Sequence, residues 1–315
     1  MQMTILSAGP MTTVQDEGRF GLMNAGFSPN GAMDARSMHI ANILVGNVHG
    51  DAVLEMTMMG ASVTFDCNTV IALTGADMAP TLDGVEIPMY RAVAVHAGSV
   101  LALGMARSGM RGYLAVAGGF DLPYVMGSFS TNLKVHVGGF EGRKLQNGDV
   151  IPLRSAMEPI FVGKRATVNP DSYDSEVTVR VVLGPQDDYF TEDGKRTFLG
   201  TAYTVTDKSD RMGVRLDGEK IESKNGVDIL SDGIATGSVQ IPASGTPIIM
   251  MADRQTTGGY AKIATVISAD LPLIAQAKPG TQIRFAAVSQ QDAAKLYKKD
   301  IRRRRALEYQ MLSER

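Results

Sequence analysis

The stretch VTVRVVL, residues 177–183, places an apolar side chain at every second position. This period of two is the pattern of a β-strand, whose successive side chains point to opposite faces. Similar short runs recur at residues 70–73, 92–95, 100–103, 113–116 and 283–288. Most of the 34 glycines lie between such runs, where tight turns would connect strands. Because so many strands must close or stack to protect their edges, the pattern predicts a mainly β protein of barrels or sandwiches.

Helices are expected at three places only. Asp34 is positioned to cap a helix that ends near Val45. A short helix is predicted over 270–277, before a Pro-Gly pair, and Ser289 is positioned to cap a long polar helix over 290–313. The predicted fold class is therefore mainly β with few helices, the last of which is a basic helix at the C-terminal end.

Composition narrows the class of protein. The 315 residues suffice for two domains, and the 31 basic and 33 acidic side chains give a net charge of -2, which favours neither nucleic acid nor anionic lipid. No apolar run approaches the ~18–20 residues of a membrane span, and residues 1–10 lack the pattern of a secretory signal. A single cysteine, Cys67, leaves no intrachain disulfide. We expect a cytoplasmic protein without nucleic-acid or membrane partners.

The domain boundary is expected where prolines and polar residues interrupt the β pattern, near residues 155–176. We predict an N-terminal β-rich domain over 1–158, a linker over 159–176, a C-terminal β-barrel over 177–288 and a basic helical tail over 289–315. The similar segments LDGVEI, 82–87, and LDGEKI, 216–221, each predict a hairpin. They leave open whether the two domains are a duplication.

The tail carries seven cations between residues 295 and 305. Such a charge is compatible with an electrostatic contact to an acidic partner or to a phosphate. A solvated surface helix accounts for it without any partner, and this is the interpretation that we favour.

Several kinds of site are absent from the sequence. It has no phosphate loop of the form G-x-x-x-x-G-K-[ST], no G-x-G-x-x-G after a strand and no G-x-S-x-G. The four histidines, His39, His49, His96 and His136, lack the spacing of metal ligands, so we predict no metal site. Any chemistry must therefore come from carboxylates, cations, hydroxyl groups and backbone amides.

Four polar segments place charged residues beside glycine; three of them follow apolar, strand-like runs, where barrel sites are often built, and the third along the chain places an Arg beside Ser and Asp in a turn. They are TGAD (74–77), GPQDD (184–188), SDRMG (209–213) and ADRQTTGGYAK (252–262). The last is the strongest candidate, since its glycines, Gly258 and Gly259, would let backbone N–H groups approach an anion; an ordinary turn is the alternative. Asp16 and Arg19 form a weaker candidate of the same kind. These residues predict a polar, anion-compatible site without naming a reaction.

The same segments belong to a longer set of motifs, which span about residues 4–288 in order. The others are TTVQD with GR (12–19), GAMD (31–34), ALTGAD (72–77), YLAVAGG (113–119), GGFEGR (138–143) and SDGI (231–234). On these motifs the chain resembles the carboxyltransferase subdomain A/B family, which includes the C subunit of 5-oxoprolinase, allophanate hydrolase subunit 2 and the antagonist of a sporulation kinase inhibitor. It is also similar to part of the carboxyltransferase region of urea carboxylases. The tail beyond Ser289 is not part of the resemblance.

The resemblance implies two β-barrel-like domains related to the cyclophilin-like fold. It also implies a bacterial hetero-oligomer with separate B and A subunits, in which ATP-dependent hydrolysis opens 5-oxo-L-proline to L-glutamate. ATP would then bind at a site shared with the B subunit.

For that activity we assign Arg211, Asp253 and Lys262 as catalytic residues. The predicted substrate-binding residues, for a small polar amide, are Asp77, Gln186, Asp210, Asp232, Arg254, Gln255, Thr256 and Tyr260. One of the cations Arg211, Arg254 or Lys262 would neutralise charge on a phosphoryl group transferred to the amide oxygen.

Two alternatives stay open. The first is a biotin-dependent carboxyltransferase that acts on a urea-like amide, with Asp253 and Lys262 orienting carboxybiotin and substrate and Tyr260 lining the pocket. Since the chain has no biotinylation site, another protein would have to supply the biotin. The second is a non-catalytic binder that sequesters a kinase inhibitor similar to the B subunit.

Overall fold

The structure is a computed structural model that describes residues 1–155 and 173–313. Within these residues the chain forms two compact units. Unit 1 comprises residues 1–20, 30–155 and 302–313, and unit 2 comprises 21–29 and 173–301. The predicted linker, 159–176, lies largely outside the described residues, so the predicted domain boundaries stay a prediction. In the part of the chain that is described, no helix combines the length and the apolar character of a membrane span.

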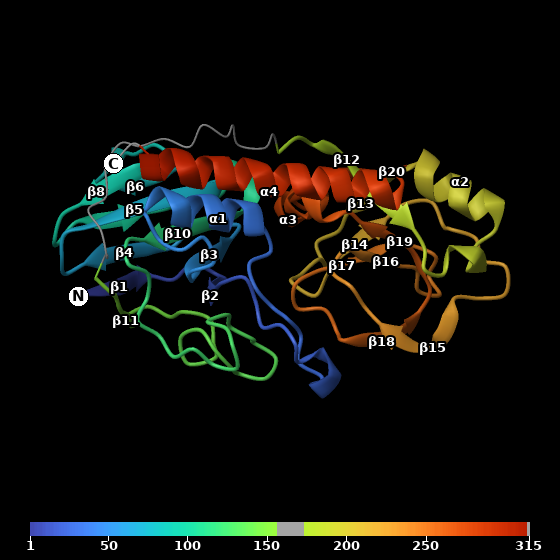
Figure 1. Ribbon diagram of the computed structural model, residues 1–315, viewed down its shortest axis with the longest axis horizontal. Coiled ribbons are helices and arrows are strands. Elements are labelled where there is room, and N and C mark those ends of the chain that lie inside the picture. The colour runs from blue at the N-terminus through green and yellow to red at the C-terminus, as the bar shows by residue number, and fades with distance from the viewer. Residues whose placement is uncertain (156–172, 314–315) are drawn as a thin grey trace. The chain divides into compact units, whose positions relative to one another are not determined.

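Unit 1 contains two antiparallel sheets (Figure 1). One runs in the order β11 (Val150–Pro152), β1 (Gln2–Ser7), β4 (Ser62–Phe65), β9 (Val100–Ala102), β6 (Thr81–Leu82) and β7 (Val85–Glu86). The other runs in the order β2 (Thr12–Gln15), β3 (Val53–Thr57), β10 (Ser108–Val116), β5 (Thr69–Asp77) and β8 (Ala92–Val95). Buried side chains from both sheets, such as Ile5, Val63 and Leu114, share one apolar core. Unit 1 is therefore two sheets packed on each other.

Helix α1 (Ala35–Leu44) packs on β5 and β10 of this unit (Figure 1). Its predicted cap is confirmed: the Asp34 carboxylate accepts hydrogen bonds from the Ser37 N–H at 3.0 Å and from the Ser37 hydroxyl at 2.6 Å. A buried tyrosine fixes the same end, because the Asp34 N–H donates to the Tyr113 hydroxyl at 2.8 Å. The helix start is thus determined by capping together with packing on the sheet.

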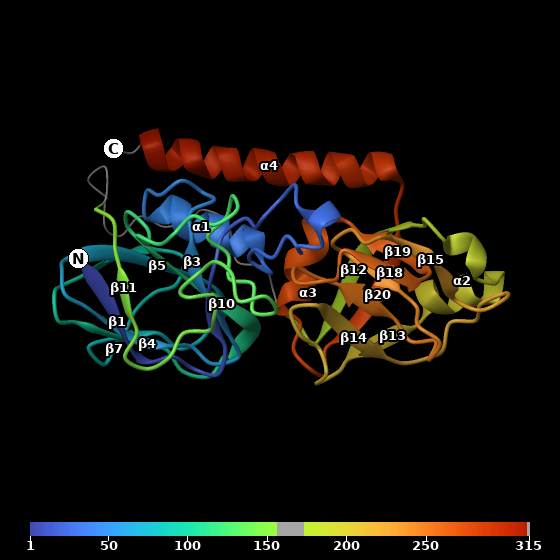
Figure 2. The same cartoon turned by 90° about the horizontal axis from the view of Figure 1, so that it is seen from below.

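Unit 2 is built around a closed barrel (Figure 2). Its strands, in order around the barrel, are β12 (Glu176–Leu183), β19 (Lys262–Val266), β16 (Ser238–Gln240), β17 (Ile248–Met250), β14 (Gly213–Asp217), β13 (Ala202–Val205) and β20 (Gln282–Ala287). The parallel pair of β12 and β20 completes the closure, in register from Glu176 opposite Gln282 to Val181 opposite Ala287. A separate two-stranded ribbon joins β15 (Asp228–Gly233) to β18 (Thr257–Tyr260). Closure leaves the barrel itself without an open edge.

The remaining elements are short helices and one long one. They are the 3₁₀ turns η1 (Met23–Ala25), η2 (Asp187–Tyr189) and η3 (Ser268–Asp270), and the helices α2 (Glu192–Gly200), α3 (Leu271–Gln276) and α4 (Gln290–Ser313). The prediction of α3 and α4 is confirmed, and the Ser289 hydroxyl accepts from the Asp292 N–H at 3.1 Å at the start of α4. The mainly β fold class and the strands named from the sequence are also confirmed.

Two local predictions need correction. Helix α2 was not predicted, because its two glycines and its polar surface are not typical of a helix. Thr191 caps this helix, and Phe198 anchors it by stacking on Phe285 at 4.4 Å between ring centroids. The hairpin predicted at 82–87 forms from β6 and β7. The one predicted at 216–221 is wrong, because β14 ends at Asp217 and pairs with β13 and β17 instead.

Helix α2 gives a test of the packing in unit 2. A Cβ at Gly194 would lie 2.2 Å from the backbone oxygen of Glu222, whereas one at Gly200 meets nothing within 4 Å. We expect Gly194→Ala to lower the free energy of unfolding by about 1–3 kcal/mol, although alanine is the better helix former. Gly200→Ala, the matched control, is expected to be neutral or stabilising by up to about 1 kcal/mol. Urea unfolding of both variants measures this, and equal effects would contradict the packing described.

Candidate functional site

Ten of the eleven site residues predicted from the sequence lie in unit 2. They are Gln186, Asp210, Arg211, Asp232, Asp253, Arg254, Gln255, Thr256, Tyr260 and Lys262. Asp77 lies in unit 1, at the end of β5, where its carboxylate accepts from the Ala79 N–H at 2.9 Å. Six of the unit 2 residues form two groups, Gln186 and Asp232 around Lys262 and Asp210 and Asp253 around Arg211.

The first group centres on Lys262, the first residue of β19. Its side chain is only 2% exposed, and its Nζ lies 2.8 Å from Oδ2 of Asp232, which is 54% exposed on β15. The Gln186 amide donates to the same carboxylate oxygen at 3.4 Å, and its carbonyl oxygen accepts from the Lys262 N–H at 3.1 Å. The ammonium and the amide thus converge on one exposed carboxylate.

The two members of this ion pair differ in environment, since the ammonium is buried and the carboxylate is exposed. The hydrogen bond from Lys262, followed by one from the Gly233 N–H, lowers the pKa of Asp232, so this carboxylate stays ionised. Burying an ammonium group is costly unless an acceptor compensates it. Because the compensating carboxylate faces water, an anion from solution can replace it without leaving the lysine unpaired. The arrangement is suited to binding an anionic group of a small molecule.

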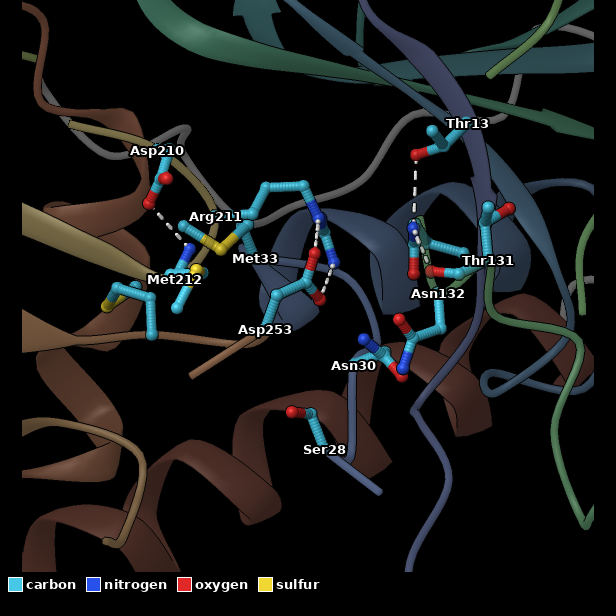
Figure 3. A network of polar contacts seen from close by, with 12 residues as sticks. Thr13, Ser28, Asn30, Met33, Thr131, Asn132, Asp210, Arg211, Met212 and Asp253 are labelled. Carbon is cyan, nitrogen blue, oxygen red and sulfur yellow. Dashed lines mark hydrogen bonds and ion pairs between the residues drawn. The ribbon is translucent and has the colours of Figure 1, made fainter. Parts of the chain in front are cut away.

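The second group is the ion pair of Arg211 and Asp253, drawn in Figure 3. Arg211 Nε donates to Oδ2 at 2.8 Å and Nη2 donates to Oδ1 at 3.0 Å, a bidentate geometry. The two side chains are 8% and 17% exposed. The backbones pair as well, since the Asp253 N–H donates to the Arg211 carbonyl oxygen at 2.9 Å. Such a fork is stronger and more directional than a single contact, so it holds these two segments together.

Asp210 shapes the turn that carries Arg211. Its Oδ1 accepts from the Met212 N–H at 2.8 Å (Figure 3) and from the Gly213 N–H at 3.0 Å. These bonds are those of an Asx turn, which orders the backbone before β14. These contacts indicate that Asp210 positions Arg211. The predicted contact of Asp210 with substrate stays a prediction.

Arg254 is buried; two of its hydrogen bonds go to backbone carbonyls, and Nη2 donates to the Met23 sulfur at 4.0 Å. Nε donates to Ile234 at 2.8 Å and Nη1 donates to Met251 at 3.3 Å. Burial lowers the pKa of Arg254 to about 10. The Ser28 hydroxyl donates to the Arg254 carbonyl oxygen at 2.5 Å, which ties residues 21–29 to unit 2. These contacts fasten three backbone segments, while the predicted role in substrate binding stays a prediction.

The two glycines of the strongest sequence candidate lie in strand β18, paired with β15, rather than in an open anion-binding turn. A Cβ at Gly258 would come within 2.7 Å of the Gln255 Nε2 and 2.9 Å of the Gln240 Nε2. Glycine is therefore needed there so that two side-chain amides can approach the strand. The backbone of this strand also serves the pairing, since the Ile234 N–H donates to the Thr256 carbonyl oxygen at 3.0 Å.

Gln240 is a residue that the sequence analysis missed. It is buried at the end of β16, and its amide donates to the Tyr260 carbonyl oxygen at 3.4 Å. The signal that could have found it is a lone amide in the otherwise apolar run VQI, residues 239–241. Buried polar side chains of this kind are kept for a hydrogen bond or a ligand. Tyr260 itself is partly exposed beside it.

The weaker candidate, Asp16 with Arg19, supports the fold of unit 1. The Asp16 carboxylate accepts from the hydroxyls of Ser128 and Ser130 and from the N–H groups of Gly18 and Phe129, at 2.5–2.8 Å. The Arg19 side chain is fully buried and donates to backbone carbonyls of the same loop. Both residues order the irregular segment that follows β10. Among the described residues, no group of three or more His, Cys, Asp or Glu side chains could hold a metal ion.

The barrel, with its buried cations and their carboxylate partners, defines a β-rich protein with a polar site on the second unit. The chain belongs to the family described as carboxyltransferase domain, subdomain A and B, whose sequence model matches residues 25–287. The resemblance stated from the motifs is thereby confirmed.

Relatives within this family fall into two kinds. The chain is 40% identical over 296 residues to the C subunit of 5-oxoprolinase from Haemophilus influenzae, covering 94% of each protein. It is 40% identical over 295 residues to the protein of the same name from Escherichia coli. It is 35% identical over 309 residues to the urea amidolyase of Saccharomyces cerevisiae, of which it covers 17%.

Solved structures show the same likeness at the level of the fold. The urea amidolyase of K. lactis superimposes with a TM-score of 0.92 at 30% identity, over 97% of this chain. The urea carboxylase of Kluyveromyces lactis gives the same TM-score and identity. The chain spans 20% and 29% of the lengths of those two proteins.

The Arg211 fork yields a stability prediction. Removing one partner of a largely buried ion pair leaves the other without compensation, so we expect Arg211→Ala to lower the free energy of unfolding by about 2–4 kcal/mol. The control is Arg196→Ala, which breaks an ion pair with Asp193 on the exposed surface of α2 and should cost less than about 0.5 kcal/mol. Thermal unfolding of the two variants measures the difference. An Arg211→Ala variant as stable as the control would show that the fork contributes nothing to folding.

Proposed function

We propose that this chain is one subunit of a 5-oxoprolinase, which opens 5-oxo-L-proline to L-glutamate with hydrolysis of ATP. The observation that carries the proposal is the end-to-end similarity to two proteins named as the C subunit of 5-oxoprolinase, at 40% identity and with more than nine-tenths of each chain covered. Such a chain requires partners, and we infer that these are the A and B subunits of the enzyme.

The chemistry explains why ATP is needed. The lactam carbonyl of 5-oxoproline is a weak electrophile, so its oxygen first attacks the γ-phosphorus of ATP, and the bond to the β-phosphate oxygen breaks to release ADP. Water then adds to the activated carbon, and the ring C–N bond breaks to give a free amine and an acyl phosphate. A second water molecule hydrolyses the acyl phosphate to the glutamate carboxylate and inorganic phosphate.

Lys262 is the residue best suited to hold an anionic group during these steps. Its ammonium is buried, and its partner Asp232 is exposed on the ribbon formed by β15 and β18. We assign Lys262 to the carboxylate of 5-oxoproline or to the transferring phosphoryl group, either of which would take the place of Asp232. Gln186, which already donates to that carboxylate, would then donate to the same anion.

Arg211 serves this site less directly. Its guanidinium is already engaged by Asp253 in a bidentate pair, so binding a substrate anion would require breaking two charge-assisted hydrogen bonds. The sequence also lacks a phosphate loop. Together these points favour an ATP site that is completed by residues of the B subunit.

A carboxyl transfer to a urea-like amide is the second candidate. It is favoured by the family to which the chain belongs and by the TM-score of 0.92 to urea amidolyase. This chain has no biotinylation motif, so carboxybiotin would arrive on another protein.

The test is reconstitution. The chain is mixed with its cognate A and B subunits, and 5-oxoproline-dependent ADP release is measured with each protein omitted in turn. We expect release to stop when this chain is left out. Release that is unchanged without it would overturn the proposal. A stable complex with the B subunit that gives no release would instead favour carboxyl transfer or a binding role, and urea with carboxybiotin is then the next substrate pair.

Within the active mixture, Lys262→Ala should reduce kcat/KM for 5-oxoproline by about 10²-fold or more, because a buried charge that meets the substrate is lost. Lys262→Arg should recover part of this activity, since it retains the charge. Lys195→Ala, which removes a lysine paired with Glu192 on α2, is the matched control and should leave kcat/KM unchanged. Circular dichroism verifies that each variant is folded. Full activity in Lys262→Ala would refute the assignment.

A further inference from the structure

The C-terminal half of α4 packs against unit 1. Leu307 and Met311 are buried there, in a core that they share with Met38 and Leu44 of α1. In Figure 2 the C-terminal part of α4 runs above α1. This packing holds 302–313 through apolar contacts, which do not depend on pH. The family model ends at residue 287, before this helix begins.

Beside these apolar contacts lies a cluster of five titratable or charged side chains. Glu17 follows β2, His39 is on α1, His49 precedes β3, and Arg304 and Glu308 are on α4. Glu17 Oε1 lies 3.0 Å from His39 Nε2 and 3.6 Å from His49 Nε2. From the helix, Arg304 Nη1 lies 3.2 Å from His39 Nδ1, and Glu308 Oε1 lies 3.0 Å from His49 Nδ1. The histidines, 10 residues apart, meet at 5.2 Å between ring centroids.

The contact with Arg304 determines the protonation state of His39. A guanidinium can only donate, so His39 Nδ1 must accept, and the ring proton must be on Nε2, from which it is donated to Glu17. Neutral His39 thus links Arg304 of α4 to Glu17. Because Nε2 carries this proton, it is not available as a metal ligand. Protonation of Nδ1 would replace an acceptor with a second donor and place two cations face to face.

His49 also lies near the charges of α4. Burial, then Arg304 and His39, lowers its pKa, against the opposing effect of Glu308 and Glu17. The hydrogen bond from His39 is the main cause that lowers the pKa of Glu17. Of the two groups on α4, Arg304 lowers the pKa of His49 more than Glu308 raises it, so the docked helix makes protonation of His49 less favourable. Stability of docking is therefore full above the ordinary histidine pKa of about 6.5 and falls as the pH drops below it.

We propose that Glu17, His39 and His49 form a pH-sensitive latch that holds residues 302–313 of α4 on unit 1 at neutral pH and releases them on acidification. Of the neighbouring charges, Asp51 pairs with Arg154 at 2.9 Å, and Arg302, Arg303 and Arg305 are exposed. Acidification removes the polar contacts of the latch, so only the apolar contacts of Leu307 and Met311 then oppose opening of the helix.

Hydrogen exchange on the full chain tests the latch. Exchange of backbone amides in peptides that cover 302–313 is followed by mass spectrometry at pH 7.5 and 5.5, after correction for the intrinsic rate. We expect protection to fall by about tenfold for each pH unit below 6.5 over which one proton is taken up. Protection in β5 and β10 of unit 1 should not change. Constant protection of 302–313 between the two pH values would overturn the proposal.

Variants separate the latch from a general effect of acid. In the double variant His39→Gln and His49→Gln, the amides can donate and accept but do not titrate, so 302–313 should stay protected at both pH values. The matched control, His96→Gln with His136→Gln, alters the histidines outside the cluster and should keep the full pH response. Should the first double variant fail to fold, Glu308→Gln serves instead, and it should reduce protection already at pH 7.5. A pH response that persists without His39 and His49 contradicts the latch.

Discussion

Closure of the unit 2 barrel by the parallel pairing of β12 and β20 is the constraint from which the candidate site follows. On its other side β12 pairs with β19, and just past the end of β12 the Gly184 N–H donates to the Ile263 carbonyl oxygen at 2.9 Å. The chain then turns so that Gln186 meets Lys262 through both backbone and side chain. Two residues that are distant in sequence are thus held at one end of the barrel by the hydrogen bonds that close it.

The two ion pairs of the candidate site differ in how accessible the carboxylate partner is to solvent. The Arg211 fork is bidentate and largely buried on both sides, so it acts as a fixed connection between β14 and the segment after β17. Lys262 is buried as well, but its carboxylate partner is exposed on a ribbon outside the barrel. Since the charge of the lysine must be compensated, we propose that a substrate anion and Asp232 compete for the same position. Such competition would let a chain without a phosphate loop take part in the reaction of an anionic substrate.

Many strands could be predicted from the sequence, whereas the contacts between side chains of the candidate site could not. Alternation and short apolar runs, such as 177–183, identified β12 and β20 of the barrel and several strands of unit 1, because such strands have a buried face. Helix α2 was not predicted, because its two glycines disfavour a helix and Phe198 is its one large buried side chain. The partnership of Lys262 with Asp232 could not be read from spacing, because a bulged ribbon brings the residues together. His39 and His49 likewise meet only when α1 and the loop before β3 fold against each other.

The most direct test of the exchangeable ion pair is the effect of Asp232→Asn on kcat and KM in 5-oxoproline-dependent ADP release by the assembled enzyme. This change removes the competing carboxylate and leaves the shape of the side chain intact. We predict that kcat is retained and that KM for 5-oxoproline does not rise, because Lys262 becomes available to the substrate anion. A fall in kcat by about 10²-fold or more would show that Asp232 takes part in the chemistry itself and would contradict its role as an exchangeable partner.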